Sequence, residues 1–178
     1  MLPSGHIAGG ALLGALRSRR SASHPGLLIG GGITAATLPD LDLLLPLLLD
    51  RVGVDHRLNS GVHHGWITHT PLFWGVVTSC ARRLARHRSA PRWAPEAARM
   101  LTLGATLHLT QDSIANTVAL LWPLSRREYG LGLDRLPDVT DHEEYIRRYP
   151  SSPAGKLEAG LVLAAFSVCA VRLAQRAG

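Results

Sequence analysis

The first residues in this chain whose spacing could serve chemistry are a histidine and an aspartate in the segment His108-Leu-Thr-Gln-Asp112. On a helix, positions i and i+4 lie on the same face, one turn apart. An imidazole and a carboxylate placed in this way can hold a divalent metal ion. Alternatively, the histidine is hydrogen-bonded to the aspartate within a packed core. The motif alone leaves both interpretations open.

Two more aspartates follow a proline in Leu38-Pro-Asp-Leu-Asp42, inside an otherwise apolar stretch. A charged side chain near the middle of a bilayer costs about 2.5–3.5 kcal/mol, so protein or metal must receive Asp40 and Asp42. Their hard oxygen atoms suit zinc, manganese or magnesium. Alternatively, Asp40 caps a helix and Asp42 interacts with its dipole. This alternative explains one aspartate better than it explains two, so metal ligation is favoured.

Imidazoles are dense in His63-His-Gly-Trp-Ile-Thr-His69-Thr. If a helix starts at Trp66, His69 lies in its opening turns and His64 just before it, so both rings can approach one point. Thr68 or Thr70 could then orient a ligand through a hydrogen bond. A surface loop with exposed histidines is the alternative, and the apolar neighbours make it weaker. His6, near the N-terminus, gains interest only together with these motifs.

Helical segments are expected over 4–17, with Ser4 as the cap, and over 62–84 and 97–121. The stretch 27–49 is apolar enough to scan as a membrane-spanning segment, except that Pro39, Asp40, Asp42 and Pro46 interrupt it. The segment 157–173 is nearly continuous apolar sequence, at the lower limit of length for a transmembrane helix. Residues 122–153 form a functional loop or a short helix pair. Because β-branched alternation is nearly absent, we expect an all-α fold. The expected architecture is one domain, 1–178, built as a helical bundle with membrane-associated or membrane-spanning helices.

The basic residues favour an anionic partner. Nineteen Lys and Arg against 13 Asp and Glu give a formal net charge of +6. The arginines gather at the ends of apolar stretches, which is typical of anchoring at a lipid interface. Nucleic acid is the weakest candidate partner because only 5% of residues are aromatic. Walker-type, GxSxG, Rossmann and zinc-finger patterns are absent from the sequence.

Taken together, the four motifs resemble a bacterial inner-membrane protein family described as predicted metal-dependent hydrolases, some of them LexA-regulated. The resemblance runs from His6 to about Leu133 and includes the segment Trp122-Pro-Leu-Ser-Arg-Arg. After His64 this chain has Gly65 and Trp66 where the family has Arg-Gly, and Thr70 replaces a serine. The family is distantly similar to zinc-dependent phospholipases C and single-strand nucleases. That similarity implies phosphoester hydrolysis, by analogy of fold.

The resulting hypothesis is a site for one to three divalent ions, with zinc as the expected metal. Its seven candidate ligands exceed the four of a single zinc ion. They are His6, Asp40, Asp42, His64, His69, His108 and Asp112.

The hypothesis predicts a membrane-bound hydrolase that uses metal-activated water on a phosphoester or lipid-linked substrate at the bacterial inner membrane. Asp42 or Asp112 could act as the base. Arg126 and Arg127 could bind the anionic group bidentately, and a membrane-interface role for them is equally supported. The alternative to an enzyme is a non-catalytic membrane protein with a structural metal site or a buried His/Asp network.

Overall fold

The computed structural model describes residues 1–18, 25–44, 64–136 and 141–175, with the single positions 48, 51 and 139. The loop expected over 51–61 lies, apart from Arg51, outside the described residues. The described elements run in the order α1 (Pro3–Ser18), α2 (Pro25–Thr37), η1 (Leu38–Leu43), η3 (Ile67–His69), α4 (Pro71–Ala85), α5 (Ala94–Ala115), α6 (His142–Arg148), η4 (Tyr149–Ser151) and α7 (Pro153–Ala174).

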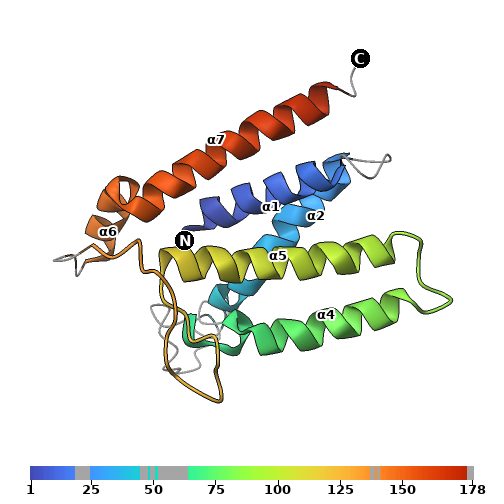
Figure 1. The fold of residues 1–178 in the computed structure, drawn as a ribbon, viewed down its shortest axis with the longest axis horizontal. Helices are drawn as coiled ribbons and strands as arrows, with labels where there is room; N and C mark the ends of the chain where they lie inside the picture. Colours follow the sequence, from blue (N-terminus) through green and yellow to red (C-terminus); the bar gives the residue numbers. More distant parts are fainter. Residues whose placement is uncertain are drawn as a thin grey trace.

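Four helices, α1, α4, α5 and α7, run roughly along the long axis of the molecule, and α2 runs obliquely and passes behind α5 (Figure 1). The helix α5 contacts α1, α2 and α4, and α7 packs against α1. Within the described residues the extended structure is limited to one isolated antiparallel bridge, between Val118 and Tyr129. The all-α fold expected from the sequence is therefore confirmed.

Glycines allow α1 and α2 to approach at backbone distance. A Cβ atom on Gly14 would lie 2.2 Å from the carbonyl oxygen of Leu28, and one on Gly10 would lie 2.4 Å from that of Gly32. Real Cβ atoms do not come so close, so these positions of α1 accept only glycine unless the helices separate. Close approach through small residues is typical of helix packing in membrane proteins.

Several helix ends differ from the sequence-based expectation. Ser4 is not a cap, because α1 begins at Pro3 and the Ser4 hydroxyl instead donates to Glu158. Helix α4 starts only at Pro71, where Thr70 caps it by accepting from the Phe73 amide at 3.2 Å. Proline is well tolerated in a first helical turn because that turn leaves the amide unpaired.

The helix expected over 97–121 is α5, which starts three residues earlier and ends at Ala115. Asn116 adopts an extended conformation there. The chain then turns back, and the amides of residues 131 to 134 donate to the terminal carbonyls of residues 113 to 116, at 2.7–3.3 Å. Tertiary hydrogen bonds thus pair the last carbonyl groups of the helix. The periodicity of apolar residues does not reveal such bonds, so it does not predict where the helix ends.

The protein buries several polar side chains and exposes large apolar ones, which is unusual for a water-soluble protein. The largest fully buried side chains include His6, His69, His108 and Asp112. Large apolar side chains are exposed instead, with Phe166 75% and Leu163 68% accessible. A polar interior with an apolar exterior is what a lipid environment stabilises.

Among the described helices, α7 is the one long and apolar enough to cross a membrane, with 22 residues and a mean hydropathy of 1.8. At 1.5 Å per residue it measures about 33 Å, close to the hydrocarbon thickness of a bilayer. Near its start, the buried Glu158 accepts hydrogen bonds from the Tyr149 hydroxyl at 2.7 Å and the Leu2 amide at 3.2 Å. These contacts join α7 to the beginning of α1.

A candidate metal centre at one end of the bundle

Four side chains from three elements converge at the end of the bundle that holds the N-terminus. Asp40 comes from η1, His69 from η3, and His108 and Asp112 from α5. One potential ligand atom from each lies within 4.8 Å of all the others. Asp40 is 17% exposed, and the other three side chains are fully buried.

The spacing of these atoms suits a single ion. From His69 Nε2 the distances are 3.3 Å to His108 Nε2 and 3.4 Å to Asp40 Oδ1, and from His108 Nε2 to Asp40 Oδ1 it is 3.5 Å. Asp112 Oδ2 lies 2.9 Å from His108 Nε2 and 3.7 Å from His69 Nε2. Ligands about 2.0–2.1 Å from a tetrahedral zinc ion are about 3.4 Å from one another.

Each of the three buried histidines has its Nδ1 atom next to an acceptor. His108 Nδ1 lies 2.7 Å from the Ala36 carbonyl, and His6 Nδ1 lies 3.2 Å from Gln111 Oε1. The Gln111 amide donates to the Gly5 carbonyl at 2.8 Å, which fixes its oxygen towards His6. An Nδ1 proton bound in this way leaves the Nε2 lone pair available inside the cluster.

Asp42 provides the corresponding acceptor for His69. Its Oδ2 atom lies 3.3 Å from His69 Nδ1 and also accepts from the Thr68 hydroxyl. Asp42 therefore contacts the side of the His69 ring that faces away from the four-ligand group. This arrangement supports Thr68 as an orienting residue and gives Asp42 the position of a partner to a ligand.

His6 and His64 lie next to the group through Asp112. His6 Nε2 is 3.1 Å from Asp112 Oδ1, and His64 Nε2 is 3.7 Å from Asp112 Oδ2. The rings of His6 and His108 are stacked, with centroids 3.9 Å apart. The N-terminal ammonium of Met1 also reaches Asp112 Oδ1, at 2.8 Å. Six of the seven predicted ligands thus surround the hollow, with Asp42 behind His69.

Charge is concentrated in this buried cluster. Burial disfavours a charged imidazole, but hydrogen bonds that the ring donates to Asp40 and Asp42 outweigh it and raise the pKa of His69 to about 9. Burial likewise opposes ionisation of Asp112, yet the imidazoles of His108, His6 and His64 beside its carboxylate hold its pKa far below the usual value. Without a metal ion, the cluster is therefore a network of charge-assisted pairs.

Buried polar atoms without hydrogen bonds indicate whether the cluster could hold a cation. Among the described side chains, His6 Nε2 and Asp112 Oδ2 are buried and make no contact with hydrogen-bond geometry, although other ring and carboxylate atoms lie close. Buried polar atoms normally have partners. A nitrogen lone pair and a carboxylate oxygen that face one hollow are the donor set of a divalent ion, so the residues fit a metal.

Among the described residues, neither of the two arginines predicted to bind substrate forms a hydrogen bond or ion pair with a cluster side chain. Arg126 and Arg127 are exposed. The Arg127 guanidinium lies over the Tyr129 ring, 5.7 Å from its centroid. Their predicted role with substrate stays a prediction.

Sequence reasoning missed the residues that support the cluster. Gln111 precedes Asp112 on the buried face of α5, and its position beside a candidate ligand was a usable signal. Glu158 was another, because a lone carboxylate in an apolar segment requires a partner. The Ala36 carbonyl gave no sequence signal, since every residue has a carbonyl group.

Comparison with known proteins agrees with the exposed apolar surface of α7. The family model for the YdjM inner membrane protein matches residues 1–177. The chain belongs to the YdjM inner membrane protein family. No curated protein and no solved structure matches it. Membership in the YdjM family places the chain at the inner membrane, in agreement with the exposed, apolar α7.

Proposed function

We propose that this protein is a membrane-bound, metal-dependent hydrolase that acts on a phosphoester. The observation that carries the proposal is the convergence of the Nε2 atoms of His69 and His108 with oxygens of Asp40 and Asp112, at 2.9–3.7 Å. Each ring is held from behind by an acceptor on Nδ1. Such support for ligand rings is a regular feature of metal sites.

The chain's own residues have separable tasks in this proposal. His69, His108, Asp40 and Asp112 hold a divalent ion, with zinc as the expected metal. A bound ion supplies Lewis acidity and lowers the pKa of a water molecule to about 7. Asp42 and the Ala36 carbonyl keep the two rings oriented. His6 and His64 offer ligands for a further ion or hydrogen bonds to substrate.

The proton acceptor is one of two carboxylates. A very low pKa makes Asp112 a weak base, which favours a ligand role for it. Asp42 Oδ1 is buried and has no hydrogen-bond partner among the described side chains. Of the two predicted bases, Asp42 therefore keeps one carboxylate oxygen available for a proton, on the side of His69 away from the four-ligand group.

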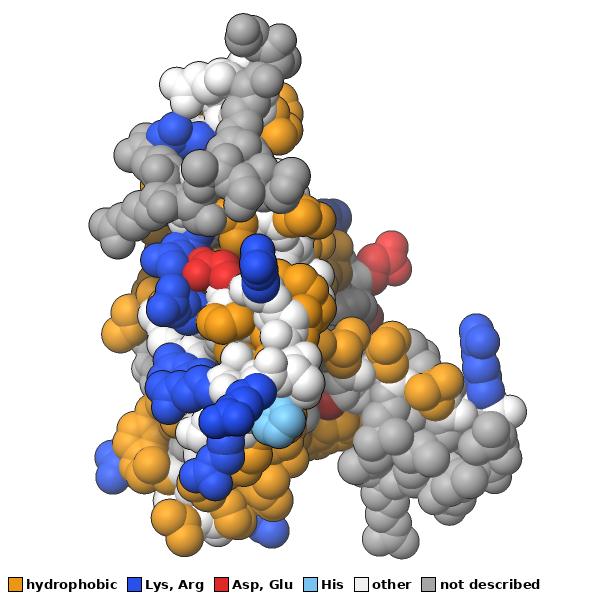
Figure 2. Space-filling model, turned by 90° about the vertical axis from the view of Figure 1, so that its right-hand side faces the viewer, with side chains coloured by type: hydrophobic (Ala, Val, Ile, Leu, Met, Phe, Trp, Pro, Cys, Tyr) orange, Lys and Arg blue, Asp and Glu red, His pale blue; other side chains and the backbone are white. Residues whose placement is uncertain are grey.

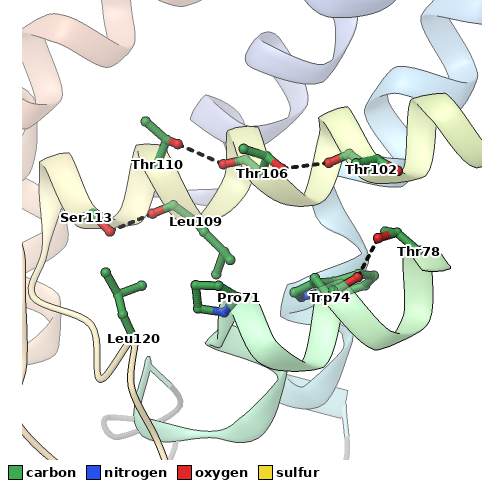
Figure 3. A pocket seen from close by; sticks show the side chains of 10 residues that line it. Pro71, Trp74, Thr78, Thr102, Thr106, Leu109, Thr110, Ser113 and Leu120 are labelled. Atoms are coloured by element: carbon green, nitrogen blue, oxygen red, sulfur yellow. Dashed lines mark hydrogen bonds between the residues drawn. The ribbon is translucent and has the colours of Figure 1, made fainter.

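Access and surroundings support a substrate with an apolar part. Asp40 and His64 are the partly exposed members, at 17% and 22%, so substrate reaches the cluster from their side. A groove of about 440 Å³ lies between α4 and α5 (Figure 3). Its lining includes Pro71, Leu109 and Ser113, which are close sequence neighbours of the ligands. A lipid-linked phosphoester could place its chain there.

Elemental analysis of protein purified without added metal is the first test. We expect close to one zinc ion or more per chain, and a large loss in His108→Ala. His87→Ala is the matched control, because His87 is exposed and, in the part of the chain that the structure describes, its ring bonds only to the neighbouring Ser89. Phosphodiesterase activity that needs metal and disappears in His108→Ala would support catalysis. Absence of bound metal under all loading conditions would contradict the proposal.

A structural role is the second candidate, and the charge pairing favours it. A protonated His69 between Asp40 and Asp42 forms a stable network without any ion. In that case removing one partner leaves a buried charge unpaired and destabilises the fold by about 3–5 kcal/mol. Bound metal without turnover on a broad panel of phosphomonoesters, phosphodiesters and lipids would indicate that the metal has a structural role and not a catalytic one.

A further inference from the structure

The end of the bundle opposite the His/Asp cluster is strongly basic. Five arginines lie between positions 82 and 92, in the last turn of α4 and in the connection to α5, and all are exposed. They are Arg82, Arg83, Arg86, Arg88 and Arg92. Figure 2 looks onto this end, where Lys and Arg side chains gather over the surface.

These arginines have no carboxylate partner among the described residues. The acidic residue at this end, Glu96, already pairs with Arg17 at 2.9 Å and with Arg99 at 3.4 Å. Hydrogen bonds from Arg17 lower the pKa of Glu96, so it stays ionised within that pair. The positive charge of the five arginines is therefore available to an anionic ligand.

A large apolar groove begins at this basic end and extends between α2 and the α4–α5 pair. Its volume is about 1150 Å³, above the range of about 300–1,000 Å³ for ordinary ligand pockets. Leu27 and Gly31 of α2 line it, together with Leu38 at the start of η1, and the span from Leu27 to Leu38 is about 16 Å. Arg92 and Trp93 lie at its mouth, and Arg86 stands between two further lining residues, Ala85 and His87.

We propose that this groove binds an anionic phospholipid, with the head group at the arginines and an acyl chain along α2. The charge at the mouth selects a phosphate-bearing head group, because guanidinium groups pair bidentately with phosphate oxygens. The apolar part of the groove beyond the arginines excludes soluble anions as the main ligand, because they have no apolar chain to place there. The arginines at the head-group end lie at the opposite end of α5 from the metal cluster, and none of the four candidate metal ligands lines the groove.

Trp93 reports directly on occupancy, because its side chain lines the groove and is 69% exposed. The full chain is reconstituted in phosphatidylcholine bilayers and titrated with brominated phosphatidylglycerol or brominated phosphatidylcholine. We expect saturable quenching with about tenfold preference for the anionic lipid. The variant Trp93→Phe should lose this quenching, which would identify Trp93 as the tryptophan that the bound lipid quenches.

Two pairs of variants separate the groove from general surface attraction. Gly31→Leu fills the groove, since a Cβ at Gly31 meets open space, and we expect it to abolish the preference. Gly30→Leu is the control, because Gly30 is equally open but does not line the groove. Arg86→Gln with Arg92→Gln should weaken the preference, and Arg147→Gln with Arg148→Gln, at the opposite end, should leave it unchanged.

The possible outcomes distinguish the proposal from its alternatives. Equal quenching by both lipids would overturn it. A preference that survives Gly31→Leu would also overturn it, because the arginines would then attract only the membrane surface. Neither readout depends on metal or turnover, so this test is independent of the proposed hydrolase function.

Discussion

At the scale of the residue, the decisive feature is that imidazole Nε2 atoms face carboxylates while their Nδ1 atoms are held from behind. Asp42 illustrates the distinction, because it contacts His69 Nδ1 instead of the four-ligand group. We expect Asp42→Ala to weaken metal binding by about 10- to 100-fold, as is usual when a partner of a ligand is lost. Asp40→Ala should be more severe. Calorimetric titration with zinc measures both, and equal losses in the two variants would contradict this ranking.

The raised pKa of His69 predicts proton release on metal binding. With a pKa of about 9 the ring is protonated at pH 7 in the metal-free protein, and a ligand imidazole must be neutral. Metal binding at pH 7 should therefore release about one proton from His69, and affinity should rise about tenfold per pH unit towards pH 9. Calorimetric titration with the metal in buffers of different ionisation enthalpy gives the number of protons released. Affinity that falls over this range would contradict the assignment.

At the scale of the element, the glycine contact of α1 with α2 determines where His6 lies relative to Asp40. Gly14→Ala places a Cβ 2.2 Å from the Leu28 carbonyl, so the helices must separate. We expect a loss of about 1–3 kcal/mol in the free energy of unfolding. Gly75→Ala is the control, because a Cβ there meets open space and alanine favours the helix. Thermal unfolding in detergent compares them, and equal stability of the two variants would refute the close contact.

At the scale of the whole molecule, a polar cluster lies inside while the large apolar side chains of α7 face outwards, which suits a helix surrounded by lipid. Phe166→Arg puts a charge near the middle of that helix, where insertion costs about 2.5–3.5 kcal/mol. We expect less protein to remain in membranes after alkaline extraction. Gln175→Arg, beyond the end of α7, should behave as the unmodified chain does. Full retention of Phe166→Arg would mean that α7 does not cross the bilayer.

The sequence alone determined the fold class, the position of α7 and the set of residues around the hollow. These follow from local chemistry: an i, i+4 spacing holds His108 and Asp112 on one face, and carboxylates such as Asp40 cannot lie unpartnered in an apolar stretch. Only the tertiary structure decided which atom of each residue faces the hollow. Asp42 lies behind His69 because the 3₁₀ turn η1 packs against η3, and Ser4 bonds to Glu158 because α7 returns to the start of α1. Such contacts join residues far apart in the chain, and neither spacing nor residue type encodes them.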